Sequence, residues 1–288
     1  MEEVSYATRT DVGKKRQHNE DCYGVNETLG LYVIADGMGG HASGEVASKI
    51  AVAVIEEKVT QGLTLAAAIE QAHLAILEGV KNGEGKKGMG TTIVAVQLHE
   101  NEYTLAWVGD SRAYIWDGEL QQISQDHSYV QKLLDSGAIT QEEAITHPNR
   151  NIITQSLGAG APQITVDHVH GQFSPPQKIL LCSDGLTDEV LDGEIAVILE
   201  QGGDDQTIVN NLIRSALDHG GKDNVTVLLV SAPDTTIGTE TERTESASPM
   251  QKTGEPQPHD ANEKSFAWFA LGIGIIFLII VFSIILGD

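Results

Sequence analysis

Short apolar runs alternate with polar, glycine-containing segments along most of the chain before Pro233. Runs of this length, rich in Val, Ile and Leu and bounded by Gly, Asp and Asn, are typical of strands. The sequence therefore predicts strands at 31–35, 92–98, 104–108, 113–116, 178–182 and 225–230.

Two longer stretches repeat their apolar residues at helical spacing instead. They predict helices over 43–59, where Ser43 is placed to cap the start, and over 64–81. Two further helices are expected near 129–136 and 205–219. Most strands follow one another directly, as in antiparallel sheets, and the helix pairs fall between groups of strands. This order favours an α+β layered sandwich over a doubly wound parallel fold.

The composition changes after Ala232. Residues 233–265 are rich in Thr, Glu, Ser, Pro and Gln and poor in large apolar side chains, which is the composition of a disordered linker. Residues 266–286 contain no charge, and a helix of this length is about 31 Å long, close to the thickness of bilayer hydrocarbon. The expected organisation is a globular domain at 1–232, a linker at 233–265 and a transmembrane helix at 266–286.

The location of the globular domain follows from the two ends. Residues 1–11 are polar and lack the apolar run of a secretory signal. We therefore expect a single-pass protein of the cell membrane whose globular domain is cytoplasmic. Lys264 beside the span agrees with that orientation.

Net charge and cysteine content limit the partners and the cellular compartment that we expect for this chain. The chain has 41 Asp and Glu against 18 Lys and Arg, a net charge of −23, so nucleic acid is not expected as a partner because it would be repelled. Two cysteines, Cys22 and Cys182, rule out a disulfide framework and fit a reducing compartment.

Aspartates recur at the ends of the predicted strands. Asp36, Asp110 and Asp184 each follow an apolar run, and Asp223 precedes one. A single aspartate at such a place is usually a turn former. Four that converge would repel one another, and a bound cation removes that cost. Oxygen ligands without Cys or His indicate Mg²⁺ or Mn²⁺ rather than Zn²⁺.

A further polar segment, 16–21, precedes these strands. Its adjacent acids Glu20 and Asp21 could hold metal-bound water, and Arg16 could bind a phosphoryl group with two parallel hydrogen bonds. Taken alone, the segment is better explained as a charged surface turn.

Seven motifs stand in a fixed order: RQHNED (16–21), DGMGGH (36–41), GMGTT (88–92), VGDSR (108–112), DH (126–127), SDGL (183–186) and DNVT (223–226). This series closely resembles that of the protein phosphatase 2C family (PPM type), in its bacterial branch, over residues 5–230. The resemblance implies a four-layer αββα sandwich of two mostly antiparallel sheets flanked by helix pairs, to which the C-terminal transmembrane helix is added here.

The resemblance also implies the metal ligands. Asp36 should bridge two Mn²⁺ or Mg²⁺ ions, with the carbonyl of Gly37 on one of them, and Asp184 and Asp223 should complete the other. Asp110, with Asp184, matches the acid that holds a third, weaker ion in bacterial members.

The remaining site residues follow the same pattern. Glu20 and Asp21 resemble the pair that orients metal-bound water, with Glu20 also a candidate metal ligand, and Arg16 resembles the phosphate-binding arginine. The implied reaction is hydrolysis of phosphoserine and phosphothreonine on proteins by a water or hydroxide that bridges the two ions. The implied partners are phosphorylated proteins and a membrane-bound, eukaryotic-like serine/threonine kinase whose signalling the enzyme reverses.

One position departs from the family. Many eukaryotic members have a histidine, a candidate general acid, directly after the Asp-Gly pair, and this chain has Met38, which cannot donate a proton. His41 matches the bacterial pattern and is either that acid or a residue that packs at the start of a helix. His127 is expected to be structural, and His168 and His170 to lie at the surface of a strand.

Residues 136–161 are polar and resemble the mobile flap of bacterial relatives, and a plain surface excursion is the alternative. Two alternative functions make different predictions. A membrane-tethered, non-catalytic phosphoprotein-binding module predicts a missing metal ligand, whereas Asp36, Asp184 and Asp223 are all present. The acidic charge and the motif order disfavour a metal-dependent phosphodiesterase or nuclease.

Overall fold

The computed structural model describes residues 4–39, 43–160 and 162–233. These residues lie in a first compact unit, Met1–Glu240, and the second, Thr241–Asp288, is outside the described residues. The expected transmembrane helix at 266–286 and all but the first residue of the expected linker therefore lie outside them too. Within the described ranges, no helix is both long and apolar enough to cross a bilayer.

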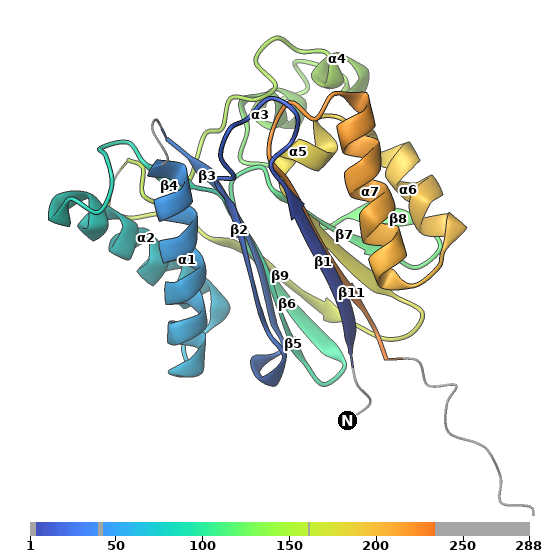
Figure 1. The fold of residues 1–288 in the computed structure, drawn as a ribbon, viewed down its shortest axis with the longest axis horizontal. Helices are drawn as coiled ribbons and strands as arrows, with labels where there is room; N and C mark the ends of the chain where they lie inside the picture. The colour runs from blue at the N-terminus through green and yellow to red at the C-terminus, as the bar shows by residue number, and fades with distance from the viewer. Residues whose placement is uncertain (1–3, 40–42, 161, 234–288) are drawn as a thin grey trace, which may run out of the picture. The chain divides into compact units, whose positions relative to one another are not determined.

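Two antiparallel sheets face each other (Figure 1). One has the strand order β2-β3-β5-β6-β9, with β4 also paired to β3. Its strands are β2 (Asp21–Asn26), β3 (Leu31–Met38), β4 (Gly90–Thr91), β5 (Ile93–His99), β6 (Glu102–Val108) and β9 (Asp167–Gln172). The other has the order β1-β11-β10-β7-β8, from β1 (Ser5–Asp11), β11 (Val225–Ser231), β10 (Lys178–Cys182), β7 (Arg112–Trp116) and β8 (Leu120–Gln122).

Helices cover the outer face of each sheet (Figure 1). The pair α1 (Ser43–Thr60) and α2 (Leu65–Asn82) packs on the first sheet, and α6 (Asp192–Gln201) and α7 (Asp205–His219) pack on the second. Short elements complete the unit: α3 (Tyr129–Asp135), α4 (Gln141–Ile145), α5 (Asp184–Thr187) and the 3₁₀ turn η1 (Glu27–Leu29).

Three separate apolar cores hold these layers together. The middle core joins the sheets, with Ile34 and Val94 of one against Leu181 and Leu228 of the other. The outer cores lie between each sheet and its helices. The fully buried strands explain why the apolar runs are nearly continuous rather than alternating. The four-layer αββα sandwich expected from the sequence is thus confirmed for the described residues.

Candidate active site

Asp36 lies within β3 rather than after it. The apolar run predicts a strand that stops at Ala35, but β3 continues to Met38 because Gly37 and Met38 pair with β4. The carbonyl of Asp36 accepts the N–H of Thr92 at 2.8 Å. The sheet therefore fixes the backbone that carries this carboxylate.

Gly37 permits a close approach of three segments. A Cβ at this position would overlap the carbonyl oxygens of both Gly44 and Glu20. The N–H of Gly37 donates to the Glu20 carbonyl at 3.2 Å. The first turn of α1 and the segment before β2 are thus held against the strand next to Asp36.

Asp21 lies beside Asp36 in the β2–β3 register and links the two sheets. Its Oδ2 accepts hydrogen bonds from Ser183 Oγ at 2.9 Å and from Thr226 Oγ1 at 2.6 Å, both attached to the second sheet. Its Oδ1 is buried and has no hydrogen-bond partner among the described residues.

Glu20 points toward the start of α1. Its Oε1 accepts the N–H of Gly44 at 3.1 Å, an arrangement that the positive end of a helix dipole favours. Its own N–H donates to Asn224 Oδ1 at 2.8 Å. The structure thus places Glu20 next to Asp21, with one carboxylate oxygen bonded to the helix.

Asp184 and Asp223 come from the second sheet. Asp184 is the first residue of α5, directly after β10, and Asp223 precedes β11. The charge of Asp184 raises the pKa of Asp36, so these two carboxyls lie near each other where the two sheets meet. Asp110, in the turn between β6 and β7, is buried at 8% exposure.

Burial dominates the electrostatics of this cluster. It raises the pKa of Asp36 well above its usual value, and the charges of Asp184, Asp21 and Asp110 raise it further. Burial, and then the charge of Asp110, do the same to the pKa of Asp184.

The pKa values of Asp21 and Asp110, the two carboxyls with an unpartnered oxygen, are raised as well. Burial raises the pKa of Asp21 to about 6, against the hydrogen bonds from Thr226 and Ser183. Burial raises the pKa of Asp110 to about 7, with a further contribution from the charge of Asp126. Without a cation, some of these carboxyls therefore bind protons near neutral pH rather than carry a negative charge.

Divalent cations fit this donor set. Asp21 Oδ1 and Asp110 Oδ1 are buried oxygens without a partner, and hard cations prefer carboxylate oxygen. No group of three or more His, Cys, Asp or Glu side chains within the described residues is arranged to hold a metal ion. Mg²⁺, however, usually takes one or two carboxylates and keeps several waters, so pairs such as Asp36 and Asp184 are the relevant unit.

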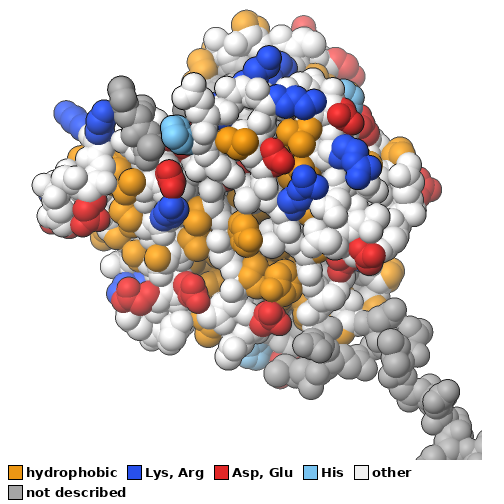
Figure 2. Space-filling model, viewed as in Figure 1, with side chains coloured by type: hydrophobic (Ala, Val, Ile, Leu, Met, Phe, Trp, Pro, Cys, Tyr) orange, Lys and Arg blue, Asp and Glu red, His pale blue; other side chains and the backbone are white. Residues whose placement is uncertain are grey.

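Arg16 lies at the mouth of the cluster. Its Nη2 is 2.6 Å from Asp223 Oδ2, and its side chain is 49% exposed. Figure 2 shows Lys and Arg side chains gathered around the same end of the sandwich, interspersed with Asp and Glu. An anion can therefore reach the guanidinium from solvent although the chain as a whole is acidic.

Two polar residues of this site, Asp188 and Asn224, were given no role of their own in the sequence analysis. Asp188 lies one helical turn after Asp184, and its charge raises the pKa of Asp184. The four-residue spacing in the sequence could have indicated that the two side chains are neighbours. Asn224 donates from Nδ2 to the carbonyls of Val12 and His18, both at 2.9 Å, and so holds the loop that carries Arg16.

The flap region, residues 136–161, contains α4 and is anchored at its end. Leu157 is fully buried and forms a bridge with Thr91 of β4. Asn151 Nδ2 donates to Asp188 Oδ2 at 2.7 Å. The segment thus borders the acidic cluster. His41 lies outside the described residues, whereas His168 and His170 are exposed on β9 as expected.

Comparisons with known proteins agree with this geometry. Residues 12–206 match the family model "Protein phosphatase 2C". The chain is 38% identical to the serine/threonine phosphatase stp of Listeria innocua over 236 residues, which cover 77% of this chain and 93% of that protein. It is 40% identical over 242 residues to the serine/threonine protein phosphatase PstP of Mycobacterium tuberculosis, covering 82% of this chain and 46% of that longer protein.

Solved structures give the same result. The Mycobacterium tuberculosis PstP/Ppp crystal structure matches with a TM-score of 0.74 and 37% identity, over 80% of this chain and 99% of that one. A PstP catalytic domain in complex with two manganese ions matches with a TM-score of 0.72 and 36% identity, over 80% and 99% of the two chains.

The class defined by this fold and this acidic site is therefore the metal-dependent protein serine/threonine phosphatase. The chain belongs to the protein phosphatase 2C family, and its relatives above are bacterial members of it. The resemblance inferred from the seven motifs is confirmed.

Proposed function

We propose that this phosphatase hydrolyses phosphoserine and phosphothreonine on proteins with two or three bound Mn²⁺ or Mg²⁺ ions. The observation that carries the proposal is the buried carboxylate cluster between the two sheets, with its unpartnered oxygens. When bound, such ions activate water and neutralise charge on a phosphoryl group. Manganese in the related PstP catalytic domain supports this choice of cofactor.

The chain's own residues take distinct roles in this proposal. Asp36, with the Gly37 carbonyl, Asp184 and Asp223 would hold the principal ions, and Asp110 with Asp184 the third. The remaining residues act on water and substrate. Asp21 Oδ1 can accept a proton of a bound water, Glu20 supports it from the start of α1, and Arg16 orients the dianionic phosphoryl group. His41 is the proposed proton donor to the leaving group.

The direct test is phosphate release by the full-length chain from a phosphothreonine peptide. We expect release that requires Mn²⁺ or Mg²⁺ and stops when a chelator is in excess. Binding of the peptide without release would instead identify a non-catalytic binding module.

Arg16→Lys should raise KM for the phosphopeptide about tenfold and change kcat less, because an ammonium cannot form the two parallel hydrogen bonds of a guanidinium. Steady-state kinetics at saturating Mn²⁺ measure this. Lys15→Ala is the control, since it removes a neighbouring exposed charge of the same sign. A KM of Arg16→Lys equal to that of wild type would show that positive charge, rather than the guanidinium geometry, matters here.

We further propose that residues 266–286 anchor the protein in the cell membrane, with the phosphatase unit in the cytoplasm. The charge-free length of this segment supports the proposal. Such an anchor places the enzyme beside a membrane-bound serine/threonine kinase whose substrates it dephosphorylates. Phosphoproteomics of a deletion strain, compared with a strain that lacks the kinase, tests this pairing.

Truncation after Ala232 should give a soluble enzyme with unchanged kcat. The reason is that β11 ends at Ser231 and that the N–H of Ala232 still donates to the Gln177 carbonyl at 3.0 Å, so the sandwich is complete at this point. Ultracentrifugation and the phosphopeptide assay measure the two properties. An insoluble or inactive product would mean that the C-terminal segment is part of the fold.

A further inference from the structure

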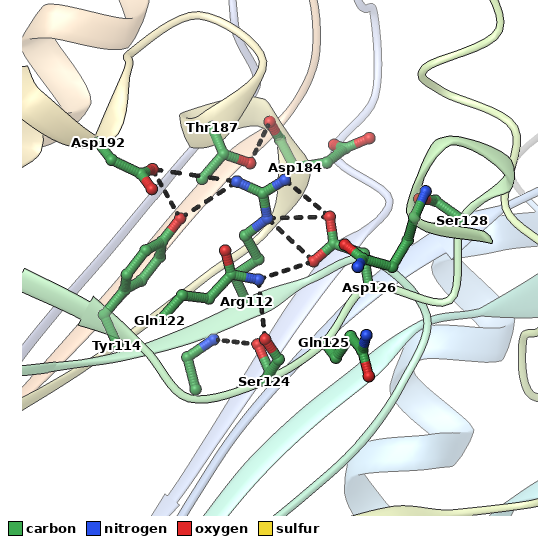
Figure 3. A network of polar contacts seen from close by, with 12 residues as sticks. Arg112, Tyr114, Gln122, Ser124, Gln125, Asp126, Ser128, Asp184, Thr187 and Asp192 are labelled. Atoms are coloured by element: carbon green, nitrogen blue, oxygen red, sulfur yellow. Dashed lines mark hydrogen bonds and ion pairs between the residues drawn. The ribbon is translucent and has the colours of Figure 1, made fainter. Parts of the chain in front are cut away.

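Among the described residues, neither Asp126 nor His127 forms a hydrogen bond with a proposed principal metal ligand, yet the two side chains bond to the two ends of the turn that carries Asp110. Figure 3 shows Asp126 facing the guanidinium of Arg112, the residue at the start of β7. Arg112 Nε donates to both Asp126 oxygens at 3.0 Å, and Arg112 Nη2 donates to Asp126 Oδ2 at 2.7 Å. The Asp126 side chain is 9% exposed, so this ion pair is shielded from water.

His127 holds the other side of the same turn. Its backbone N–H donates to the Gly109 carbonyl at 2.8 Å, and the Gly109 N–H donates to His127 Nδ1 at 3.1 Å. Because a backbone N–H only donates, Nδ1 must accept, and the ring proton lies on Nε2. That nitrogen is 3.1 Å from Asp167 Oδ2 of β9, to which it donates.

The turn between the two grips contains Asp110 and cannot move freely. Gly109 has φ +115° and lies where a Cβ would press on the Thr92 side chain, which in turn hydrogen-bonds Ser111 at 2.7 Å. Asp110 therefore has a fixed backbone on both sides, while its Oδ1 has no partner in the part of the chain that the structure describes.

We propose that Asp126 and His127 are positioning residues that set the direction of the Asp110 carboxylate toward Asp184, and thereby the affinity for a divalent cation held by that pair. The inference rests on the proposed metal role of Asp110. Outer-shell partners that orient a ligand typically change metal affinity by about 10–100-fold when they are lost.

The same motif connects Asp110 to the flap region. The His127 carbonyl accepts the Thr154 N–H at 2.7 Å, and Gln155 Nε2 lies 3.2 Å from His127 Nδ1. One histidine thus contacts the Asp110 turn, strand β9 and residues 154–155. This residue therefore connects the flap region to the turn that carries Asp110.

Two isosteric changes separate the contacts of His127. His127→Asn places an amide oxygen near the position of Nδ1 and keeps the acceptor for Gly109. His127→Gln places its amide near the position of Nε2, so it keeps the contact to Asp167 and loses the acceptor. Isothermal titration calorimetry of the metal-free, full-length chain with Mn²⁺ measures the affinity of each binding event.

We expect His127→Gln to weaken the weakest Mn²⁺ binding event about tenfold and His127→Asn to stay within about threefold of wild type. The tighter binding events should not change in either variant. Equal Mn²⁺ affinities of the two variants, at matched circular dichroism and melting temperature, would overturn the proposal.

The ion pair has a matched test of its own. Asp126→Asn should weaken the same binding event, whereas Asp192→Asn should leave it unchanged. Asp192 contacts Tyr114 at 3.0 Å and lies 4.0 Å from Arg112 on the side away from Asp126 (Figure 3). A similar loss in both variants would assign the effect to general weakening of the network and contradict the proposal.

A double-mutant cycle distinguishes this inference from the proposed function. Asp110→Asn should abolish the weakest binding event, and His127→Gln should then have no additional effect on Mn²⁺ binding. If Asp110→Asn leaves Mn²⁺ uptake unchanged, the proposed metal role of Asp110 is wrong and the inference falls with it. If only Asp110→Asn has an effect, the inference alone is wrong.

Discussion

Asp36→Asn and Asp184→Asn should each lower Mn²⁺-dependent turnover of a phosphothreonine peptide by more than about 100-fold while the fold stays intact. This loss exceeds the effect typical of an outer-shell partner because these two carboxylates are proposed to contact the ions directly. An amide has the same shape but no charge, so it cannot balance a divalent cation in a buried site.

The stability of the same variants gives an independent readout. Asp36 and Asp184 lie among other carboxylates whose negative charges raise the pKa of both, so removal of one charge relieves repulsion in the metal-free protein. We expect metal-free Asp36→Asn to melt at a temperature no lower than metal-free wild type. Stabilisation by added Mn²⁺ should be smaller in the variant.

Asp117→Asn is the matched control, since Asp117 is exposed near the β7–β8 turn. It should change neither turnover nor the response to Mn²⁺. Turnover of Asp36→Asn or Asp184→Asn near the wild-type rate at saturating Mn²⁺ would mean that the assignment of these ligands is wrong.

Much of the fold could be predicted from local pattern. Strand β10 and helix α7 have the bounds expected from their apolar residues, because each buries a full face against a neighbouring layer. Strands β1, β2 and β8 were not predicted, since each is only partly buried and its sequence is mixed. Strand β9 was expected only from its alternating histidines, His168 and His170. Pairing with a neighbour, rather than propensity, makes these segments strands.

The candidate site was predictable to a similar extent. The spacing of acids at strand ends identified Asp36, Asp110, Asp184 and Asp223, because the ends of buried strands meet at the rim of a sandwich. What the pattern could not give is the partner of each group. Ser183 and Thr226, whose hydroxyls donate to Asp21, lie far from it in the sequence. His127, which accepts the N–H of Gly109, is also distant from its partner. Such contacts depend on how the two sheets are stacked.

The metal-free protein should become less stable as pH rises from 5 to 8. The pKa of Asp110 is raised to about 7 and that of Asp21 to about 6, in both cases chiefly by burial, whereas an aspartate in an unfolded chain has a pKa of about 3.9. Between these values the folded state binds protons that the unfolded state has released. Stability from these groups is therefore present at low pH and is lost as pH passes through the folded pKa values.

We expect the melting temperature of the chelator-treated, full-length chain to fall by about 8–16 °C over this range. The two carboxyls together lose about 4 kcal/mol of stability, and a change of 1 kcal/mol shifts a unit of this size by about 2–4 °C. The decisive quantity is the difference in melting temperature between wild type and Asp110→Asn, in which the contribution of every other group cancels. The melting temperature of the variant should fall less. Added Mn²⁺ should stabilise wild type more at pH 8 than at pH 5, because its ligands must be deprotonated. A metal-free wild type whose melting temperature rises with pH by more than that of Asp110→Asn would contradict the view that the buried carboxylates repel one another until a cation binds.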